Sequence, residues 1–467
     1  MPAALKVGVI TLGCDKNTVD SERYLAQLSD YSAEYTPELG EADLIIVNTC
    51  GFIDAAKKES IDAMIEAARF KSAGRCQAVV AVGCMIERHK AELIDSLPEV
   101  DLFLGSSEMQ KLIPELNERG LLGEASEALH PGVRLYTGDL QHVRYMKISE
   151  GCDHGCAFCA IPLMRGKHRS FARSELVREA QMLELQGARE LNLVAQDLAH
   201  YGRDTRDGVK LPELLEALVA ETSIPWIRML YLYSAGITDR LLEVVARESR
   251  ILRYLDMPIQ HGSDIVLARM RRPERKRTIR DRVRKFRDAV PDVAIRTTCI
   301  VGFPGETEEQ FEELLEFLEE IQFERVGAFT YSAQEGTRAS QYADDVPETL
   351  KRERLERLTE LQRAVTAERY EARTGRTAPA LVDRADKERG TSQARLPWQA
   401  DDIDGVTHID EALSPGTIAE VAVEEVVDDY DFQASMIRVA MPASSPHARR
   451  VSRQLPVKQV TIGSYGR

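Results

Sequence analysis

The run Cys152-Asp153-His154-Gly155-Cys156-Ala157-Phe158-Cys159 places three cysteines within eight residues and offers no obvious fourth ligand. Thiolates are soft ligands that select zinc, copper(I) or iron–sulfur clusters. Structural zinc requires a closed set of four ligands, so an isolated CxxxCxxC run is an unfavourable zinc site. Three cysteines on a 4Fe–4S cube instead leave one iron open to an external molecule. The run therefore favours an iron–sulfur site with a free position. His154 is a candidate fourth ligand, but this immediate loop neighbour is expected to face solvent or substrate.

Three further cysteines each follow an apolar run that predicts a buried strand. The strands are predicted over residues 7–12, 44–47 and 78–82, the helices between them over 19–28 and 53–70, and the cysteines are Cys14, Cys50 and Cys84. This βαβ pattern predicts a parallel sheet, in which ligands gather outside the carboxyl ends of the strands. The three thiols are therefore expected to form a second metal site. The alternative is that small buried cysteines simply pack, as we expect for Cys76 and Cys299.

The composition limits the class of protein. With 467 residues the chain has room for about three domains, and its net charge of −15 at pH 7 argues against a general polyanion-binding protein. No apolar run approaches the ~18 residues of a membrane span, and the N-terminus lacks a signal-peptide pattern. Cysteines spaced as ligands, without a disulfide framework, are typical of a reducing compartment. We expect a cytoplasmic protein with no membrane partner.

The fold class is expected to be α/β multidomain. A parallel α/β domain over residues 5–117 is followed by a loose stretch around 120–138 and by a central domain over 138–372. Six strands of the central domain are predicted over residues 143–148, 190–196, 226–232, 253–258, 294–301 and 325–331. Six parallel βα units form a partial (β/α)6 barrel, short of the eight that close. The cysteine loop follows the first of these strands, which places it on the catalytic face.

The C-terminal part of the chain changes character. A helix over about 347–372 presents one apolar stripe and is expected to connect the barrel to the C-terminal residues. Short alternating strands with turn signals then predict a small antiparallel β-barrel over 375–440. Residues 441–467 have the composition of a basic, weakly structured tail.

This arrangement resembles the radical S-adenosylmethionine (SAM) methylthiotransferases over almost the whole chain. The resemblance rests on three parts in order: the N-terminal domain with three cysteines, the partial barrel with CxxxCxxC, and a C-terminal barrel like the TRAM domain. The match is closest to the branch that modifies an aspartate of small-subunit ribosomal protein S-twelve. The resemblance rests on the segments Leu12-Gly13-Cys14 with Lys16-Asn17 and Val19-Asp20-Ser21-Glu22, Glu150-Gly151-Cys152, Cys159-Ala160-Ile161-Pro162 with Met164-Arg165-Gly166, Ala195-Gln196-Asp197 with Tyr201-Gly202, Pro258-Ile259-Gln260-His261, and Val301-Gly302-Phe303-Pro304-Gly305-Glu306-Thr307. Asp15 departs from the proline expected after Cys14, which makes the local turn uncertain.

The resemblance implies a radical reaction, because the β-carbon C–H bond of aspartate is not activated for acid–base or nucleophilic chemistry. It implies two 4Fe–4S clusters and SAM, with an external electron donor, or reductant protein, and a sulfur source. Cys152, Cys156 and Cys159 would hold the cluster that binds and cleaves SAM, and Cys14, Cys50 and Cys84 the cluster that carries sulfur. No catalytic residue beyond these ligands is implied. The protein substrate would be ribosomal protein S-twelve, met free or on the ribosome.

Four residues of the cysteine loop and its flank have two interpretations each. Phe158 either lies beside the adenine of SAM, as the resemblance implies, or packs within the loop. Arg165, Lys167 and Arg169 either meet carboxylates of SAM or substrate or form a solvated basic loop.

Two other functions remain as alternatives. A tRNA adenosine methylthiotransferase is supported by the segment Arg269–Arg287, whose eleven Lys or Arg against two acidic residues can bind phosphates. Ile279, Val283 and Phe286 recur there at helical spacing, however, which favours an amphipathic outer helix with a solvated basic face. A non-catalytic iron–sulfur or zinc RNA-binding module gives no reason for an open cluster position.

The charge of the predicted C-terminal barrel favours the protein substrate. Residues 376–438 contain six Lys or Arg against fourteen Asp or Glu, a net charge of −8. A domain that grips tRNA is expected to be basic, whereas an acidic one complements a Lys/Arg-rich ribosomal protein. The alternative is that these acids only keep the domain soluble. The acidic face is expected to include Asp401, Asp402, Asp404, Glu424, Glu425, Asp428 and Asp429, and to dock S-twelve beside its target aspartate.

Overall fold

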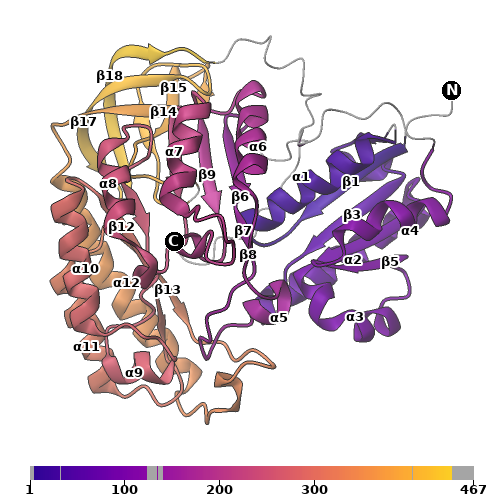
Figure 1. The fold of residues 1–467 in the computed structure, drawn as a ribbon, viewed down its shortest axis with the longest axis horizontal. Helices are drawn as coiled ribbons and strands as arrows, with labels where there is room; N and C mark the ends of the chain where they lie inside the picture. Colours follow the sequence, from indigo (N-terminus) through magenta and orange to yellow (C-terminus); the bar gives the residue numbers. More distant parts are fainter. Residues whose placement is uncertain (1–4, 32, 124–133, 135–139, 402, 444–467) are drawn as a thin grey trace.

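The computed structural model describes residues 5–31, 33–123, 134, 140–401 and 403–443. Three parts follow one another along the chain (Figure 1): an N-terminal sheet domain in indigo and purple, a central barrel in magenta to orange, and a small yellow β-barrel. Most of the loose stretch around 120–138, and all but the first three residues of the expected basic tail 441–467, lie outside the described residues. No helix among the described residues is long and apolar enough to cross a membrane.

The N-terminal domain is a five-stranded parallel sheet in the order β2-β1-β3-β4-β5. Its strands are β1 (Leu5–Thr11), β2 (Ala33–Tyr35), β3 (Leu44–Thr49), β4 (Ala78–Gly83) and β5 (Leu102–Gly105). Its helices are α1 (Asp15–Ser29), α2 (Asp54–Ala73), α3 (Cys84–Ser96) and α4 (Leu112–Glu118), with short 3-10 turns at Leu39–Glu41 and Met109–Lys111. The central strands β3 and β4 are buried along their whole length, so their apolar runs face a hydrophobic cluster on each side. The predicted parallel α/β domain is confirmed.

All six predicted strands of the central barrel are present. They are β6 (Val143–Lys147), β9 (Glu190–Val194), β10 (Trp226–Met229), β11 (Tyr254–Asp256), β12 (Ala294–Val301) and β13 (Arg325–Thr330). They form two three-stranded parallel sheets, β10-β9-β6 and β11-β12-β13. The sheets are joined by an isolated bridge between Ile227 and Ile251 and by a hydrogen bond from Leu232 N to Asp256 O. The barrel is therefore partial and is interrupted between β10 and β11.

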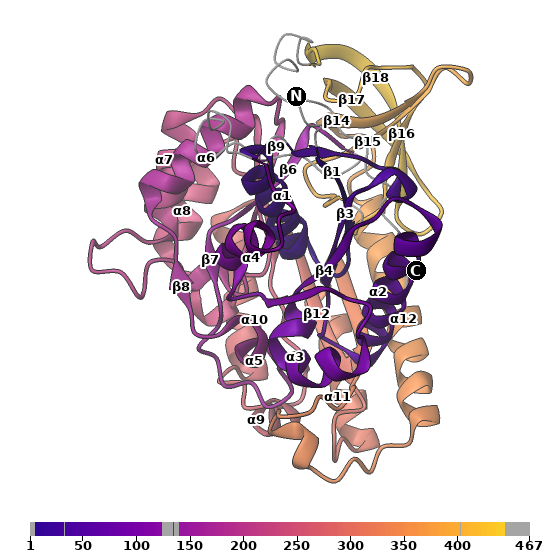
Figure 2. The ribbon, with the colours of Figure 1, turned by 90° about the vertical axis from the view of Figure 1, so that its right-hand side faces the viewer.

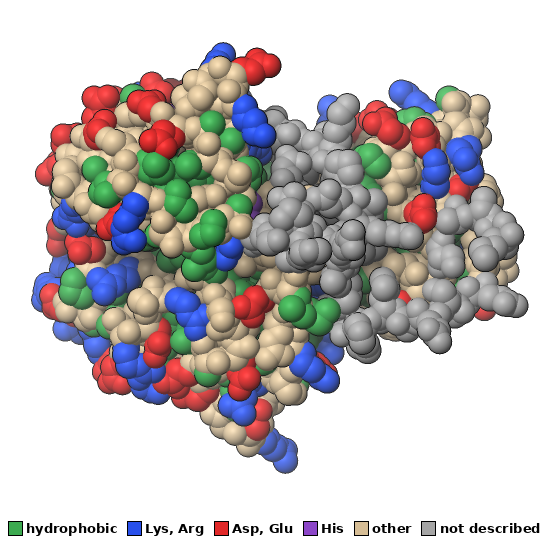
Figure 3. All heavy atoms as spheres, turned by 90° about the horizontal axis from the view of Figure 1, so that it is seen from above, with side chains coloured by type: hydrophobic (Ala, Val, Ile, Leu, Met, Phe, Trp, Pro, Cys, Tyr) green, Lys and Arg blue, Asp and Glu red, His purple; other side chains and the backbone are tan. Residues whose placement is uncertain are grey.

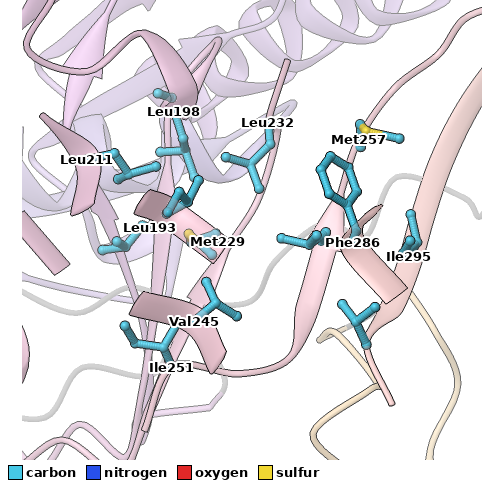
Figure 4. Packing of buried hydrophobic residues seen from close by; sticks show 14 of the residues in the cluster. Leu193, Leu198, Leu211, Met229, Leu232, Val245, Ile251, Met257, Phe286 and Ile295 are labelled. Carbon is cyan, nitrogen blue, oxygen red and sulfur yellow. The ribbon is translucent and has the colours of Figure 1, made fainter. Parts of the chain in front are cut away.

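An outer layer of helices covers the barrel strands. It consists of α6 (Arg173–Leu185), α7 (Leu211–Glu221), α8 (Asp239–Arg247), α9 (Asp264–Arg269), α10 (Lys276–Ala289), α11 (Glu308–Ile321) and α12 (Glu348–Glu371), with 3-10 turns at Leu198–His200, Ser234–Gly236 and Ala339–Gln341. Side chains from β9 to β12 and from these helices interlock in one apolar core (Figure 4). Helix α10 buries Ile279, Val283 and Phe286 and turns its basic residues outward, as the helical spacing predicts.

The C-terminal domain is a closed five-stranded barrel in the order β14-β15-β16-β18-β17. Its strands are β14 (Thr377–Asp386), β15 (Thr391–Arg395), β16 (Thr407–Ile409), β17 (Ile418–Val427) and β18 (Asp431–Met441). The neighbouring strands are antiparallel as expected, except that β16 and β18 pair in parallel. The small barrel sits above the central barrel in both ribbon views (Figures 1 and 2).

Buried ion pairs fasten the small barrel to the first residues of the central strands. Glu190, which opens β9, lies 2.7 Å from Arg228 Nε and 2.6 Å from Arg395 Nη1 of β15. Asp404 receives hydrogen bonds from Tyr254, at 2.6 Å, and from Arg325, at 3.4 Å, and these two residues open β11 and β13. The small barrel therefore caps the amino ends of the strands, opposite the carboxyl ends that carry the cysteine loop.

Candidate functional site

The cysteine loop is closed at its base by a short hairpin that the sequence did not indicate. Strand β7 (Ser149–Glu150) pairs antiparallel with β8 (Arg169–Ser170), and helix α5 (Ile161–Arg165) lies between them. Cys152 N donates to Gly166 O at 3.1 Å. Gly151 has φ +79°, and a Cβ there would lie 2.1 Å from Lys167 O, so only glycine fits at this crossing.

The far end of the loop is tied to the barrel by backbone hydrogen bonds. Ala157 N donates to Met270 O at 2.9 Å, and Ala157 O accepts from Ala339 N at 2.8 Å. Phe158 is half-buried and packs against an apolar cluster that includes Phe303 and Tyr331. Phe158 therefore packs at the carboxyl ends of β12 and β13, and a place beside the adenine of SAM stays a prediction.

The thiols of the loop lie in a shared environment. Burial raises the pKa of Cys152 to about 11 and that of Cys159 to about 12, and the Cys156 thiolate adds to both shifts. The positive charge of Arg272 acts in the opposite direction and lowers the pKa of Cys159. The Nη1 atom of Arg272 lies 3.8 Å from Cys156 Sγ. Metal binding displaces protons from such thiols, so a cationic group is needed to hold three thiolates here.

The three N-terminal cysteines come together at the carboxyl edge of the sheet. Cys14 precedes the first turn of α1, Cys50 follows β3, and Cys84 is the first residue of α3. Gly13 has φ +90°, and a Cβ there would lie 3.0 Å from Cys50 Sγ, so Gly13 allows two of the loops to approach. Burial raises the pKa of Cys50 to about 11 and that of Cys84 to about 12, with the neighbouring thiolates adding to each shift.

Arg165 joins the two groups of cysteines. It ends the short helix after the cysteine loop, yet its Nε donates to Cys84 Sγ of the N-terminal domain at 3.0 Å. Its Nη1 lies 2.7 Å from Asp20 Oδ2, and its Nη2 donates to Asn17 Oδ1 at 2.5 Å. Lys147 also binds Asp20, at 2.5 Å. A buried ion network therefore crosses the interface between the two domains.

The three basic residues after the loop, Arg165, Lys167 and Arg169, have different environments. The interpretation of Arg165 as solvated is wrong, because its side chain is 4% exposed and binds carboxylates of the chain itself. Lys167 and Arg169 are exposed, as expected of a solvated basic loop. An arginine at an ion pair of this depth cannot be inferred from sequence, since its partner Asp20 lies 145 residues away.

Asp197 holds the outer side of the cysteine loop in place. His154 Nε2 lies 2.8 Å from Asp197 Oδ2, His200 contacts the same oxygen, and Oδ1 accepts from Ala199 N and Tyr233 N. Burial would raise the pKa of Asp197, but the hydrogen bonds from both histidines outweigh it and keep this pKa well below its usual range. His154 also stacks on Tyr233 at 3.9 Å between ring centroids. His154 is thus held by Asp197 and Tyr233, yet its side chain is 21% exposed and borders a surface cavity, as expected of a residue that faces solvent or substrate.

The other two cysteines are packed. Cys76 Sγ donates to Ala78 O at 3.2 Å, and Cys299 is fully buried in the barrel core. Both expectations of simple packing are therefore confirmed.

The donor set and its surroundings fit iron–sulfur clusters. Each group offers three thiols, and arginine N–H groups approach Cys84 and Cys156 as they approach anionic sulfur. Several buried polar atoms near the loop have no partner among the described residues: Ser149 Oγ, His168 Nδ1, Gln196 Oε1, Arg272 Nε and Tyr331 Oη. Unsatisfied buried polar atoms are rare unless a ligand or water completes them.

Comparisons with known proteins decide the family. Residues 6–105 match the family described as "Uncharacterized protein family UPF0004", and residues 146–318 match the Radical SAM superfamily. "Ribosomal protein uS12 methylthiotransferase RimO" from Anaeromyxobacter (strain K) is 42% identical and covers 93% of this chain and 94% of its own. The chain belongs to the RimO family of radical SAM methylthiotransferases. Relatives of the same name from Desulforudis audaxviator and Geobacter sulfurreducens are 42% and 39% identical, over 93% and 92% of this chain and 97% and 98% of theirs.

Solved structures agree with the fold. The radical SAM methyltransferase TsrM from Kitasatospora setae, with cobalamin and a 4Fe–4S cluster bound, superposes with a TM-score of 0.52 at 11% identity. The match covers 70% of this chain and 72% of TsrM, and it bears on architecture alone. As a member of the RimO family, the chain is an enzyme that uses SAM and an iron–sulfur cluster.

The acidic residues of the small barrel are not arranged as expected. Asp404 is fully buried against the central barrel, and Asp401 lies 3.2 Å from Tyr145 Oη at the same interface. Asp402 is outside the described residues, Glu424 and Glu425 are exposed, and Asp429 binds Arg363. Acidic and basic side chains are interspersed over the upper face (Figure 3). The expectation of an acidic face is therefore wrong for Asp401 and Asp404, which lie at the interface with the amino ends of the strands. Glu424, Glu425 and Asp428 are exposed, and docking of S-twelve at these residues stays a prediction.

Proposed function

We propose that the chain transfers a methylthio group to the β-carbon of an aspartate in ribosomal protein uS12, the protein called S-twelve above. The observation that carries the proposal is the junction at Arg165. There the CxxxCxxC loop and the N-terminal cysteines approach one another across a domain interface. The names of the RimO relatives support the same substrate.

Two cluster sites follow from the two groups of thiols. We assign Cys152, Cys156 and Cys159 to the 4Fe–4S cluster that activates SAM, and Cys14, Cys50 and Cys84 to a second cluster that handles sulfur. When bound and reduced, the first cluster and SAM supply a carbon radical able to take hydrogen from an unactivated C–H bond. The adenine of SAM is assigned to the side of Phe158.

The residues of the chain hold these groups in place. Gly151, the β7–β8 hairpin and the Ala157 hydrogen bonds fix both ends of the loop. Asp197 fixes the loop between them through His154. Arg165 and Arg272 place positive charge beside sulfur atoms, which favours their anionic form. A rigid site of this kind limits side reactions of a radical.

The small barrel is assigned to substrate binding at a distance from the reacting carbon. The barrel strands, which are three to eight residues long, separate it from the cysteine face by roughly 10–26 Å. Its exposed acids, such as Glu424 and Glu425, then steer the basic body of uS12 without touching the target residue.

The acidic contribution is tested by the Glu424→Lys/Glu425→Lys variant. We expect the variant to bind uS12 more weakly, most clearly at low salt, and to cleave SAM without uS12 at the normal rate. The matched control is Glu316→Lys/Glu319→Lys, which makes the same charge change on an exposed part of α11. Equal uS12 affinity in both variants would remove the small barrel from substrate binding.

The function as a whole is tested by mass spectrometry of proteins and tRNA from cells with and without this chain. We expect an added methylthio group on one aspartate of uS12 and no change in tRNA. A tRNA change would favour the alternative function. In the basic segment, Arg280 and Lys285 pair with Glu320 and Asp239, whereas Arg271, Arg277 and Arg284 are exposed.

The remaining assignments complete this proposal. We place the domains at residues 5–117, 138–372 and 375–440, with 441–467 as a basic tail. The enzyme would work in the cytoplasm with a reductant protein and a sulfur source, and would meet uS12 free or on the ribosome.

A further inference from the structure

Lys16 is a buried lysine without a carboxylate partner. It lies in the first turn of α1, two residues after Cys14, and is 8% exposed. Its ammonium forms neither an ion pair nor a hydrogen bond with any residue that the structure describes. Its charge instead faces the ring of Tyr231, with Nζ 3.9 Å from the ring centroid.

The other buried lysines among the described residues are paired. Lys147 and Lys351 each bind two carboxylates, at 2.5 Å for Lys147 and at 2.8 Å for Lys351. Lysine is rarely buried without a partner, because removing an ammonium from water is costly and a cation–π contact offsets only part of that cost. The environment of Lys16 is therefore that of an anion-binding group.

Lys16 lies where the two groups of cysteines meet. Tyr231 follows β10, at the carboxyl ends of the central strands. Asn17, the next residue of α1, accepts from Arg165 at 2.5 Å, and the same oxygen lies 3.9 Å from Cys84 Sγ. The ammonium of Lys16 is thus placed between the N-terminal cysteines and the barrel face that carries the cysteine loop.

The other buried cations at this junction are neutralised. Arg165 and Lys147 bind carboxylates of the chain itself. Arg296, which projects from β12, lies 3.0 Å from the carboxylate of Asp256 at the end of β11. Among the described residues, Lys16 is therefore the buried cation of the junction that is free to bind an external carboxylate.

We propose that Lys16 binds the side-chain carboxylate of the target aspartate and places its β-carbon between the two cluster sites. The inference rests on the proposed function and adds the residue that recognises the reacting group. The carboxylate carbon of aspartate is bonded directly to the β-carbon, so an ion pair at the carboxylate orients the reacting C–H bond. The same charge selects aspartate over its neutral amide, because an amide forms the weaker hydrogen bond to an ammonium.

The test is a double-mutant cycle of binding, made with the reconstituted enzyme and SAM but without a reductant, so that nothing turns over. The chain is unmodified or carries Lys16→Met. The uS12 protein carries either its target aspartate, located by mass spectrometry of the reaction product, or asparagine in that place. Lys58→Met, at an exposed position on α2 of the same domain, is the matched control.

Anaerobic calorimetry measures the affinity, and two further measurements test whether Lys16 has another role. Bound iron shows whether the variant still assembles both clusters. Urea unfolding of the metal-free protein shows whether the fold needs the lysine.

We expect Lys16→Met to bind unmodified uS12 about tenfold more weakly and to bind the asparagine form as the unmodified chain does. The Lys58→Met variant should behave as the unmodified chain with both forms. Bound iron should be unchanged, and the metal-free Lys16→Met variant should be at least as stable as the unmodified chain, because methionine removes a buried charge.

Equal affinity of the unmodified chain and Lys16→Met for unmodified uS12, or an equal loss with both forms of uS12, would overturn the inference. Lower bound iron would assign Lys16 to the second cluster, lower stability would assign it to the fold, and either result would also overturn it. An unmodified chain that modifies uS12 but shows no coupling between Lys16 and the aspartate would leave the proposed function standing. A chain that neither binds nor modifies uS12 would refute both.

Discussion

The two groups of cysteines are built in different ways. Cys152, Cys156 and Cys159 lie on one short loop, whose ends are fixed by nearby backbone contacts. Cys14, Cys50 and Cys84 come from three loops at one edge of a parallel sheet. The first group needs only its loop and the barrel face beneath it, whereas the second exists only when the N-terminal sheet has folded. The comparison suggests that SAM cleavage and sulfur transfer can be separated by mutation.

The largest effect is expected from the loop. Cys152→Ala, Cys156→Ala or Cys159→Ala should reduce formation of 5′-deoxyadenosine to background, because each removes one of three ligands from the assigned SAM cluster. The measurement is chromatography of SAM products after anaerobic reconstitution and reduction. Cys76→Ala is the control, since Cys76 is buried outside both groups. Product formation by the loop variants would refute this assignment.

A smaller, selective effect is expected from the N-terminal group. Cys14→Ala, Cys50→Ala or Cys84→Ala should stop methylthio transfer, keep substantial 5′-deoxyadenosine formation, and lower bound iron by about half, one cluster of two. Iron analysis and mass spectrometry of uS12 measure both quantities in one preparation. Full iron content together with full product would refute the two-cluster proposal.

The ion network between the groups should contribute to stability. Arg165→Met removes a partner from the buried Asp20 and Glu150, so the free energy of unfolding should fall by about 3 kcal/mol. Urea unfolding of the metal-free protein measures it, and Lys167→Met, an exposed neighbour, should have almost no effect. If the two variants proved equally stable, Arg165 would not couple the domains.

The two groups of cysteines are predicted from the sequence by different signals. The loop group follows from its spacing alone, and the N-terminal group from the rule that parallel strands end at one edge. The strands β1, β3 and β4, the six barrel strands and α12 follow from apolar runs and periodicity, whereas the short strands β2, β5, β7 and β8 are not predicted. The sequence does not predict the contacts of Arg165, the hydrogen bonds of Asp197 or the position of the small barrel on the amino ends of the strands. Each of these depends on residues that only the tertiary fold brings together.

The smallest expected effect is the acid dependence of the domain interface. Burial would raise the pKa of Asp20, but Lys147 and Arg165 outweigh it and hold this pKa well below its usual range. A carboxyl whose pKa is lowered by folding contributes stability above its unfolded pKa, near 3.9, and loses it as the pH falls toward the folded value. The unfolding free energy of the metal-free protein should therefore decline below about pH 5. Asp20→Asn should make that decline shallower by up to about 1.4 kcal/mol per pH unit, whereas Asp62→Asn, at an exposed position on α2, should leave it unchanged. Urea unfolding at several pH values between 3.5 and 6 gives both slopes. Parallel slopes for Asp20→Asn and the unmodified chain would mean that this interface does not hold the carboxylate in its charged form.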